Sequence, residues 1–318
     1  METNIVIHGD SNDILSKIEP NSIDTCITDP PYGLKFKGNK WDYTLPSIDL
    51  FKKIFNVLKP GATMLCFGGS RTFHRLAINI EDSGFHIMDT IMWIYDSGFP
   101  KSVDIAYMID KNKNNLGKVI QTLDVNKNVM GGGENIKKSI QISQPNSKES
   151  EMWNGWGTAL KPSYEPILVC RKPIEGNYDD NALNWGVSGY WIDGCRIDSE
   201  KHYGIMRTKT GRWPANLIID ESVENNIEKL KSGLSKIFYC TKPTKEEKGY
   251  YNNHDTVKPL KLLEYLCNLT KTPTGGVVLD PFAGSGTTAL ACLNTDRKYI
   301  LIEKEEKYIN IINQRLNK

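Results

Sequence analysis

Residues 276–288 read GVVLDPFAGSGTT, and this stretch decides the fold class of the chain. It begins as an apolar strand, and the small residues after Gly286 predict a helix over 287–294. The glycines between them let the backbone pass close to a bound ligand, and the helix N-terminus offers free N–H groups. The stretch therefore predicts a strand, a ligand-binding turn and a helix in succession.

The rest of the chain continues this alternation. Seven short apolar runs, each bounded by polar or turn residues, predict strands. They cover residues 4–7, 24–28, 62–67, 87–95, 165–171, 276–279 and 298–302. Helical patterns cover residues 47–58, 70–83, 256–270 and 287–294. Such alternation favours a doubly wound α/β fold, with a mostly parallel sheet covered on both faces.

A second motif, Asp29-Pro30-Pro31-Tyr32, follows the strand-like run 24–28. By itself it is consistent with an ordinary turn, since Asp and Pro are common turn formers. Together with the glycine turn it resembles the amino-methylating DNA methyltransferases, which use S-adenosylmethionine (AdoMet) to methylate an exocyclic amine of adenine or cytosine. Because the Asp-Pro-Pro-Tyr motif comes first and the glycine turn last, the order resembles the circularly permuted β-type of that family. The resemblance implies a seven-stranded sheet with one antiparallel strand.

Composition and the resemblance together predict a domain organisation. Residues 1–110, 152–172 and 252–318 are expected to form one discontinuous catalytic domain, because chain ends often lie close together. Residues 111–151, rich in Asn, Lys, Ser and Gly, predict a mobile insertion. In the β-type arrangement residues 173–251 fall where target recognition lies. Residues 156–166 and 211–216 further resemble methyltransferases often carried by phages and prophages.

The cofactor-binding residues are predicted from both chain ends. Asp10 follows the first strand, where the resemblance implies a contact to the AdoMet adenine, and Glu303 ends the last strand, where a carboxylate can accept from ribose hydroxyls. Residues 254–259, HDTVKP, resemble the family motif that holds the methionine end, with Asp255 in place of proline. Thr256 also fits an N-cap of the following helix. The complete predicted set is Asp10, His254, Thr256, Lys258, Asp280, Phe282, Gly284, Gly286, Thr287 and Glu303.

A nicotinamide dehydrogenase is the rival interpretation of the glycine turn. Residues 284–289 satisfy the pattern G-x-G-x-x-A, and Glu303 stands at a plausible distance for a ribose partner. Asp280-Pro281-Phe282 ahead of the glycines and the motif at 29–32 favour the methyltransferase, in which Phe282 forms a wall of the AdoMet pocket.

The catalytic residues implied by the resemblance are Asp29, Pro30, Pro31 and Tyr32. An exocyclic amine is a poor nucleophile, so Asp29 and the Pro30 carbonyl are expected to accept hydrogen bonds from its two N–H groups. The prolines stiffen the loop, and Tyr32 can stack on a base flipped out of the duplex. The resemblance also implies adenine N6 as the target, because N4-cytosine enzymes of that family more often carry Ser at the position of Asp29. Cytosine N4 and a non-catalytic methyltransferase-like subunit stay open as alternatives.

Bulk properties define the remaining expectations. A net charge of +2 requires any DNA-binding surface to be local. The candidates are Lys201, Arg207, Lys209, Arg212, Lys242 and Lys245. Seven cysteines without a C-x-x-C pair and five histidines without ligand spacing predict no metal site. The sequence has no apolar run long enough to span a membrane and no signal-peptide pattern, so a cytoplasmic enzyme is expected. The resemblance implies DNA as its partner and allows a homodimer and a cognate restriction endonuclease.

Overall fold

The computed structural model describes residues 1–35, 38–95, 102–127, 136–197, 211–219, 238–240, 243–254 and 256–317. The chain forms two compact units. The first consists of Met1–Asp96 with Tyr164–Lys318, and the second of Ser97–Ser163. Both predicted motifs lie in the first unit, so its sheet positions the site.

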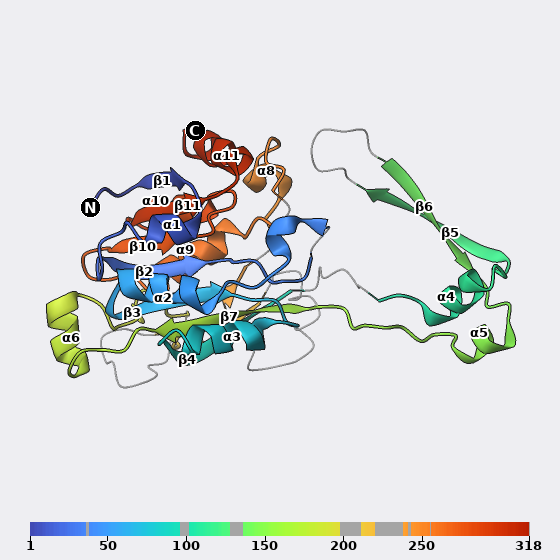
Figure 1. The fold of residues 1–318 in the computed structure, drawn as a ribbon, viewed down its shortest axis with the longest axis horizontal. Helices are drawn as coiled ribbons and strands as arrows, with labels where there is room; N and C mark the ends of the chain where they lie inside the picture. Colours follow the sequence, from blue (N-terminus) through green and yellow to red (C-terminus); the bar gives the residue numbers. More distant parts are fainter. Residues whose placement is uncertain are drawn as a thin grey trace. The chain divides into compact units, whose positions relative to one another are not determined.

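The first unit is built on a nine-stranded sheet in the order β1-β11-β10-β2-β3-β7-β4-β8-β9 (Figure 1). Its strands are β1 (Ile5–His8), β2 (Ile23–Thr28), β3 (Leu58–Phe67), β4 (His86–Ile94), β7 (Tyr164–Arg171), β8 (Leu217–Ile219), β9 (Phe238–Tyr239), β10 (Val277–Asp280) and β11 (Lys298–Glu303). Within the described residues, only β7 runs antiparallel to its neighbours β3 and β4. The doubly wound, mostly parallel sheet with one antiparallel strand is confirmed.

The predicted number of seven strands is wrong, because two short strands extend the sheet beyond β4. β8 pairs in parallel with β4, and β9 pairs in parallel with β8. Both come from residues 173–251, which were assigned to target recognition and not to the core sheet. Ile218 of β8 is fully buried, so burial of its side chain favours the extension.

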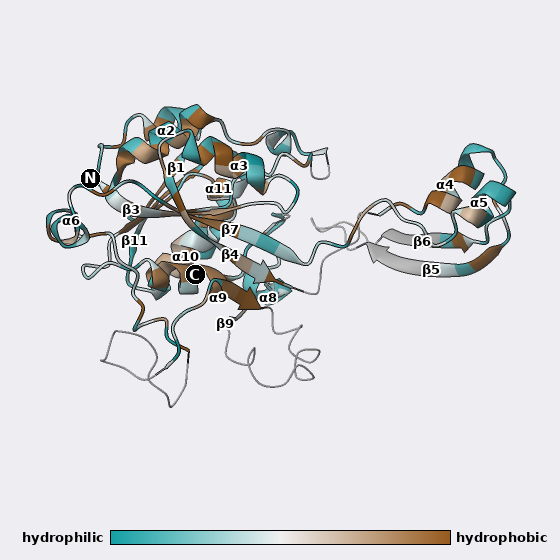
Figure 2. Cartoon of the chain, turned by 90° about the horizontal axis from the view of Figure 1, so that it is seen from below, coloured by the Kyte–Doolittle hydropathy of each residue, from teal (hydrophilic) through white to brown (hydrophobic). Residues whose placement is uncertain are grey.

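Helices cover both faces of the sheet, with α2 and α3 on one face and α9 and α10 on the other (Figure 2). The helices of this unit are α1 (Ser11–Leu15), α2 (Ile48–Val57), α3 (Phe73–Glu81), α6 (Tyr178–Trp185), α8 (Lys245–Lys248), α9 (Leu260–Leu269), α10 (Thr287–Asn294) and α11 (Glu306–Leu316). Strand residues alternate between two buried cores: Met64 packs in the core with Phe51 of α2, and Leu65 in the core with Leu266 of α9. Successive side chains of a strand point to opposite faces, which explains the alternation.

The predicted helix over 256–270 starts later than expected, and Thr256 is not its N-cap. Pro259 is the N-cap, and α9 begins at Leu260. A residue before proline is disfavoured in the helical region, so Lys258 cannot continue a helix toward Thr256. Instead, the free N–H of Leu260 donates to Glu247 Oε1 at 2.7 Å. Residues 256–258 are thereby left as a loop.

The second unit contains α4 (Ile105–Asn112), the antiparallel pair β5 (Val119–Lys127) and β6 (Ile136–Ser143), and α5 (Lys148–Met152). The predicted insertion 111–151 lies inside it. Asp110 holds the two helices together: its carboxylate accepts from the Asn146 N–H at 2.8 Å and from the Ser147 hydroxyl at 2.7 Å. None of the helices in the described part of the chain is long and apolar enough to cross a membrane.

Candidate active site

The candidate site lies where four neighbouring parallel strands end. β1, β11, β10 and β2 are adjacent and parallel, so their carboxyl ends share one edge of the sheet. Asp10, Glu303, Asp280 and Asp29 stand at or just beyond these ends. All four line one cavity of about 430 Å³. The sheet order thus brings the two chain ends together around one site.

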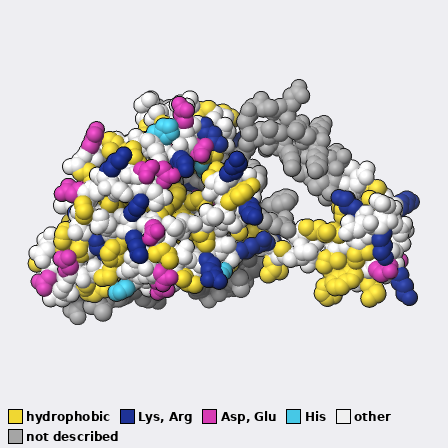
Figure 3. Space-filling view, in the orientation of Figure 1, with side chains coloured by type: hydrophobic (Ala, Val, Ile, Leu, Met, Phe, Trp, Pro, Cys, Tyr) yellow, Lys and Arg dark blue, Asp and Glu magenta, His cyan; other side chains and the backbone are white. Residues whose placement is uncertain are grey.

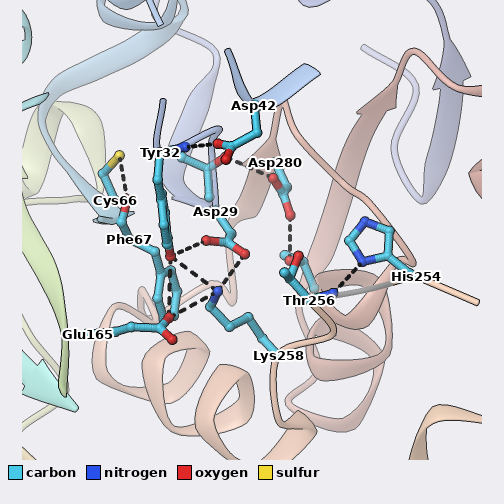
Figure 4. Close-up of polar contacts among 12 residues, drawn as sticks. Asp29, Tyr32, Asp42, Cys66, Phe67, Glu165, His254, Thr256, Lys258 and Asp280 are labelled. Carbon is cyan, nitrogen blue, oxygen red and sulfur yellow. Dashed lines mark hydrogen bonds and ion pairs between the residues drawn. The ribbon is translucent and has the colours of Figure 1, made fainter. Parts of the chain in front are cut away.

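Asp29 is the centre of a largely buried polar cluster (Figure 4). Its Oδ1 accepts from the Tyr32 hydroxyl at 2.6 Å, and its Oδ2 pairs with Lys258 Nζ at 2.6 Å. Lys258 also pairs with Glu165 Oε2 at 3.2 Å. Lys258 was predicted to hold the methionine end of a cofactor; it lines the cavity, and its ammonium also contacts the predicted catalytic carboxylate.

The protonation states in this cluster follow from its burial and charges. Burial, with Asp29 and Glu165 close by, raises the pKa of the Tyr32 hydroxyl well above its ordinary value. Burial lowers the pKa of Lys258, but Asp29 and Glu165 more than offset this, and the net shift is upward. Tyr32 is therefore a neutral hydrogen-bond donor and Lys258 a cation near neutral pH.

Asp42, which no sequence pattern predicted, holds the loop that contains Tyr32. Its carboxylate accepts from the backbone N–H groups of Tyr32 at 2.7 Å, Gly33 at 3.0 Å and Leu34 at 3.2 Å. Only 2% of Asp42 is exposed. Thr72 adds a bond from its hydroxyl to the Tyr32 carbonyl at 2.8 Å. An Asp ten residues after a proline-rich loop has no local signature, so only the folded loop reveals this role.

Asp280 fastens the glycine turn to the sheet. Its Oδ1 accepts from the Thr28 hydroxyl at 3.0 Å and the Phe282 N–H at 3.1 Å, and its Oδ2 from the Thr288 hydroxyl at 2.6 Å. Burial raises the pKa of Asp280 to about 6, although these hydrogen bonds oppose the shift. The carboxylate therefore ties β2, the turn and α10 to one another.

Glu303 supports the same turn from the neighbouring strand. Its Oε2 accepts from the Gly284 N–H at 2.8 Å and its Oε1 from the Glu305 N–H at 2.8 Å. Burial raises the pKa of this carboxyl group. Each carboxylate oxygen has two lone pairs, so Glu303 can still accept a hydrogen bond from a hydroxyl in the cavity.

The other predicted cofactor residues lie around the cavity with one exception. His254, Thr256, Phe282 and Thr287 line it, and Gly286 does not. The Thr256 N–H donates to His254 Nδ1 at 3.3 Å, and the His254 ring packs against Tyr308 with centroids 4.4 Å apart.

Among the four carboxylates at the strand ends, Asp10 is the most exposed. Its Oδ2 lies 2.9 Å from Lys304 Nζ, and its Oδ1 accepts from the Asn12 N–H at 2.9 Å. The Lys304 hydrogen bond, followed by that of Asn12, lowers the pKa of Asp10. Asp10 is therefore ionised near neutral pH and available as an acceptor.

Four of the six predicted DNA-binding residues, Lys201, Arg207, Lys209 and Lys242, lie outside the described residues. Lys245 is exposed at the start of α8, and Arg212 is half-buried. On the face drawn in Figure 3, lysines and arginines of the first unit are interspersed with acidic side chains. No cluster of three or more His, Cys, Asp or Glu able to hold a metal occurs in the described ranges.

The chain is similar to known proteins along nearly its whole length. A family model described as DNA methylase, N6_N4_Mtase, matches residues 23–314. The type II methyltransferase M.HindIII of Haemophilus influenzae is 26% identical over 357 residues, covering 98% of this chain and 94% of the relative. The type II methyltransferase M.BglI of Bacillus subtilis is 25% identical over 328 residues, covering 99% of this chain and 86% of the relative.

Solved structures share the fold. M1.HpyAVI superposes with a TM-score of 0.50 at 18% identity, covering 98% of both chains. TTHA0409 of Thermus thermophilus superposes with a TM-score of 0.50 at 16% identity, covering 98% of this chain and 93% of the other. At such identities the likeness concerns the fold alone.

Proposed function

The chain belongs to the N6_N4_Mtase family of DNA methylases, and on this premise we propose that it methylates the N6 amine of adenine. It is a DNA methyltransferase, and S-adenosylmethionine is its methyl donor. The family name covers both N6 and N4 amines, so the choice of adenine rests on Asp29 at the head of the Asp-Pro-Pro-Tyr motif.

One observation carries the proposal: a single cavity joins the two motifs. It is lined by Asp10, Gly284 and Glu303 at one part of its wall and by Asp29 and Pro31 at another. A donor and an acceptor molecule must meet in one space, with their reacting atoms close together and aligned, for direct transfer between them. The cavity provides such a space beside the only carboxylate of the Asp-Pro-Pro-Tyr motif.

The side chains that line the cavity fit AdoMet. Asp10 and Glu303 are acceptors suited to its adenine amine and ribose hydroxyls, Phe282 offers an apolar surface, and His254 and Thr256 are suited to its methionine end. When bound, AdoMet supplies a methyl group activated by positively charged sulfur.

The chain's own residues prepare the target amine. Asp29 accepts a hydrogen bond from one amine N–H and the Pro30 carbonyl from the other, which directs the nitrogen lone pair toward the methyl group. Tyr32, held by Asp29 at 2.6 Å, presents its ring to the base. The base must leave the duplex to reach this cluster, because its amine is inaccessible while stacked.

The decisive assay uses the full chain, tritium-labelled AdoMet and unmethylated DNA, followed by nucleoside analysis. N6-methyladenine is the expected product. Formation of N4-methylcytosine would show that the target is cytosine. Retained AdoMet binding without any methylated product would identify a non-catalytic subunit.

The family match over residues 23–314 rules out the dehydrogenase interpretation of the glycine turn.

Gly284 and Gly286 are expected to respond differently to alanine. Gly286 has φ +77°, and a Cβ there would lie 2.9 Å from Ile312 Cγ1, outside the cavity. Gly286→Ala should therefore cost about 1–2 kcal/mol of unfolding free energy, with AdoMet affinity changed only a few-fold. Gly284, with φ +55°, lines the cavity beside His254, so Gly284→Ala should also lose AdoMet affinity. Denaturant unfolding and calorimetry measure both effects; equal AdoMet affinities in the two variants would contradict this distinction.

We assign target recognition to residues 173–251. Substitution of Arg207 and Lys209 tests this assignment. Replacing both with alanine should weaken DNA binding and lower the slope of log K against log salt by roughly 0.9 per lost phosphate contact. Arg212 is left intact because it is half-buried, so its replacement would also remove packing contacts. DNA titrations at several salt concentrations give the slope.

The matched control for this pair removes two exposed lysines elsewhere, Lys17 and Lys52. If both double variants bind DNA alike, residues 173–251 are not the recognition surface, and the unit Ser97–Ser163 becomes the next candidate.

A homodimer and a cognate restriction endonuclease stay predictions of the family resemblance. Size-exclusion chromatography with light scattering tests the prediction of a homodimer.

A further inference from the structure

Glu165 is a second carboxylate in the cluster around Asp29, and its sequence position lies in neither motif. We propose that Glu165 is a positioning residue. Its carboxylate shares the positive charge of Lys258 with Asp29, so that Asp29 can still accept a hydrogen bond from the target amine. This inference rests on the proposed function, since it concerns the residue that accepts a hydrogen bond from the target amine.

The ammonium of Lys258 lies between two carboxylates and two aromatic faces. Its Nζ is 2.6 Å from Asp29 Oδ2 and 3.2 Å from Glu165 Oε2. It also lies 5.0 Å from the ring centroid of Phe67 and 5.5 Å from that of Tyr32. Only 11% of the Lys258 side chain is exposed. With little water around it, the ammonium depends on these neighbours for its stabilisation.

Glu165 itself is held in place from two further sides. Its Oε2 accepts from the Tyr32 hydroxyl at 3.3 Å, and the Tyr95 side chain forms a hydrogen bond with its carboxylate. β7 runs antiparallel between β3 and β4. Glu165 near the start of β7 therefore reaches the edge of the sheet where β3 and β4 end. The direction of this one strand is what places a third charged group beside Asp29.

The charge count explains what Glu165 contributes. With Asp29 and Glu165 ionised and Lys258 protonated, the three side chains have a net charge of −1. Without the charge of Glu165 the net charge of the cluster is zero, because the positive charge of Lys258 then fully balances the negative charge of Asp29. The amine nitrogen gains positive charge as it accepts the methyl group, so a net negative cluster stabilises the transition state in this buried setting. Glu165 thus preserves the excess negative charge at Asp29.

Two single substitutions separate this role from a structural one. Glu165→Gln keeps the length of the side chain and an acceptor oxygen for Tyr32, and it loses only the charge. Glu165→Asp keeps the charge and shortens the reach. We expect Glu165→Gln to lower kcat about tenfold or more, with the KM for AdoMet changed only a few-fold, and Glu165→Asp to retain more activity than Glu165→Gln. Methylation rates are measured on the full chain with DNA at saturating AdoMet.

The opposite order of activities would overturn the proposal, because a role in hydrogen bonding or packing favours Gln over Asp. Wild-type kcat in Glu165→Gln would overturn it as well, and so would a loss confined to AdoMet affinity. Thermal unfolding of each variant checks that the chain is folded at the assay temperature. Failure of the proposed function is distinguishable: the wild-type chain would then yield no methylated adenine at all, whereas failure of the inference about Glu165 leaves the wild type active and is seen only in the variants.

Discussion

Asp29→Ala is expected to lower kcat for DNA methylation by roughly 10²–10³-fold, the range for loss of one positioned hydrogen-bonding group at the reacting centre. Asp29 contacts Tyr32 and Lys258 at 2.6 Å each, so its loss disturbs one predicted AdoMet-binding residue, Lys258, while Asp10 and Glu303 keep their hydrogen bonds to Lys304 and Gly284. AdoMet affinity should therefore change only a few-fold. Rates at saturating AdoMet and calorimetry with AdoMet measure the two quantities separately.

Two further variants make the Asp29 result specific. Asp29→Asn keeps the shape and one acceptor oxygen but not the charge, and it should lose most of the activity as well. Asp179→Ala removes an exposed carboxylate in the first turn of α6, and it should behave like the wild type. Turnover by Asp29→Ala at the wild-type rate would refute the catalytic assignment, even if the protein proved to be a methyltransferase.

Asp42→Ala is expected to cost about 3 kcal/mol of unfolding free energy and to lower kcat at least tenfold. The substitution leaves three backbone N–H groups, those of Tyr32, Gly33 and Leu34, without their carboxylate acceptor. A buried donor without a partner costs about 1–3 kcal/mol, and the loop can recover part of this cost only by moving. Because that loop contains Tyr32, the movement displaces a group that holds Asp29. Denaturant unfolding and methylation rates measure the two effects.

Asp42→Asn is the matched control for the loop. Its remaining carbonyl oxygen can replace Oδ1, which accepts from Tyr32 and Gly33, so its stability and activity should lie between those of the wild type and Asp42→Ala. AdoMet affinity should be retained in both variants, since the substitution disturbs the loop that contains Tyr32. A stable Asp42→Ala with full activity would show that the loop is held by other contacts.

The strands and several helices could be predicted from local patterns alone. Buried parallel strands are short apolar runs, and each of the seven predicted strands overlaps an observed one, as 298–302 does with Lys298–Glu303. The helix predicted over 287–294 coincides with α10. Local patterns did not show that the three-residue strand β8 pairs with β4, and the start of α9 depends on Pro259 rather than on Thr256.

By itself the sequence determined the family, the order of its motifs, the strands and the carboxylates at their ends. These are local properties, because hydrophobic periodicity and turn residues act over a few neighbouring positions. Tertiary structure alone decided that Lys258 pairs with Asp29, 229 residues away, that Glu165 joins them and that Asp42 supports their loop. The physical reason is that such contacts depend on the order and direction of strands in the sheet. One antiparallel strand places Glu165 at the end of its neighbours, and no local pattern encodes that neighbourhood.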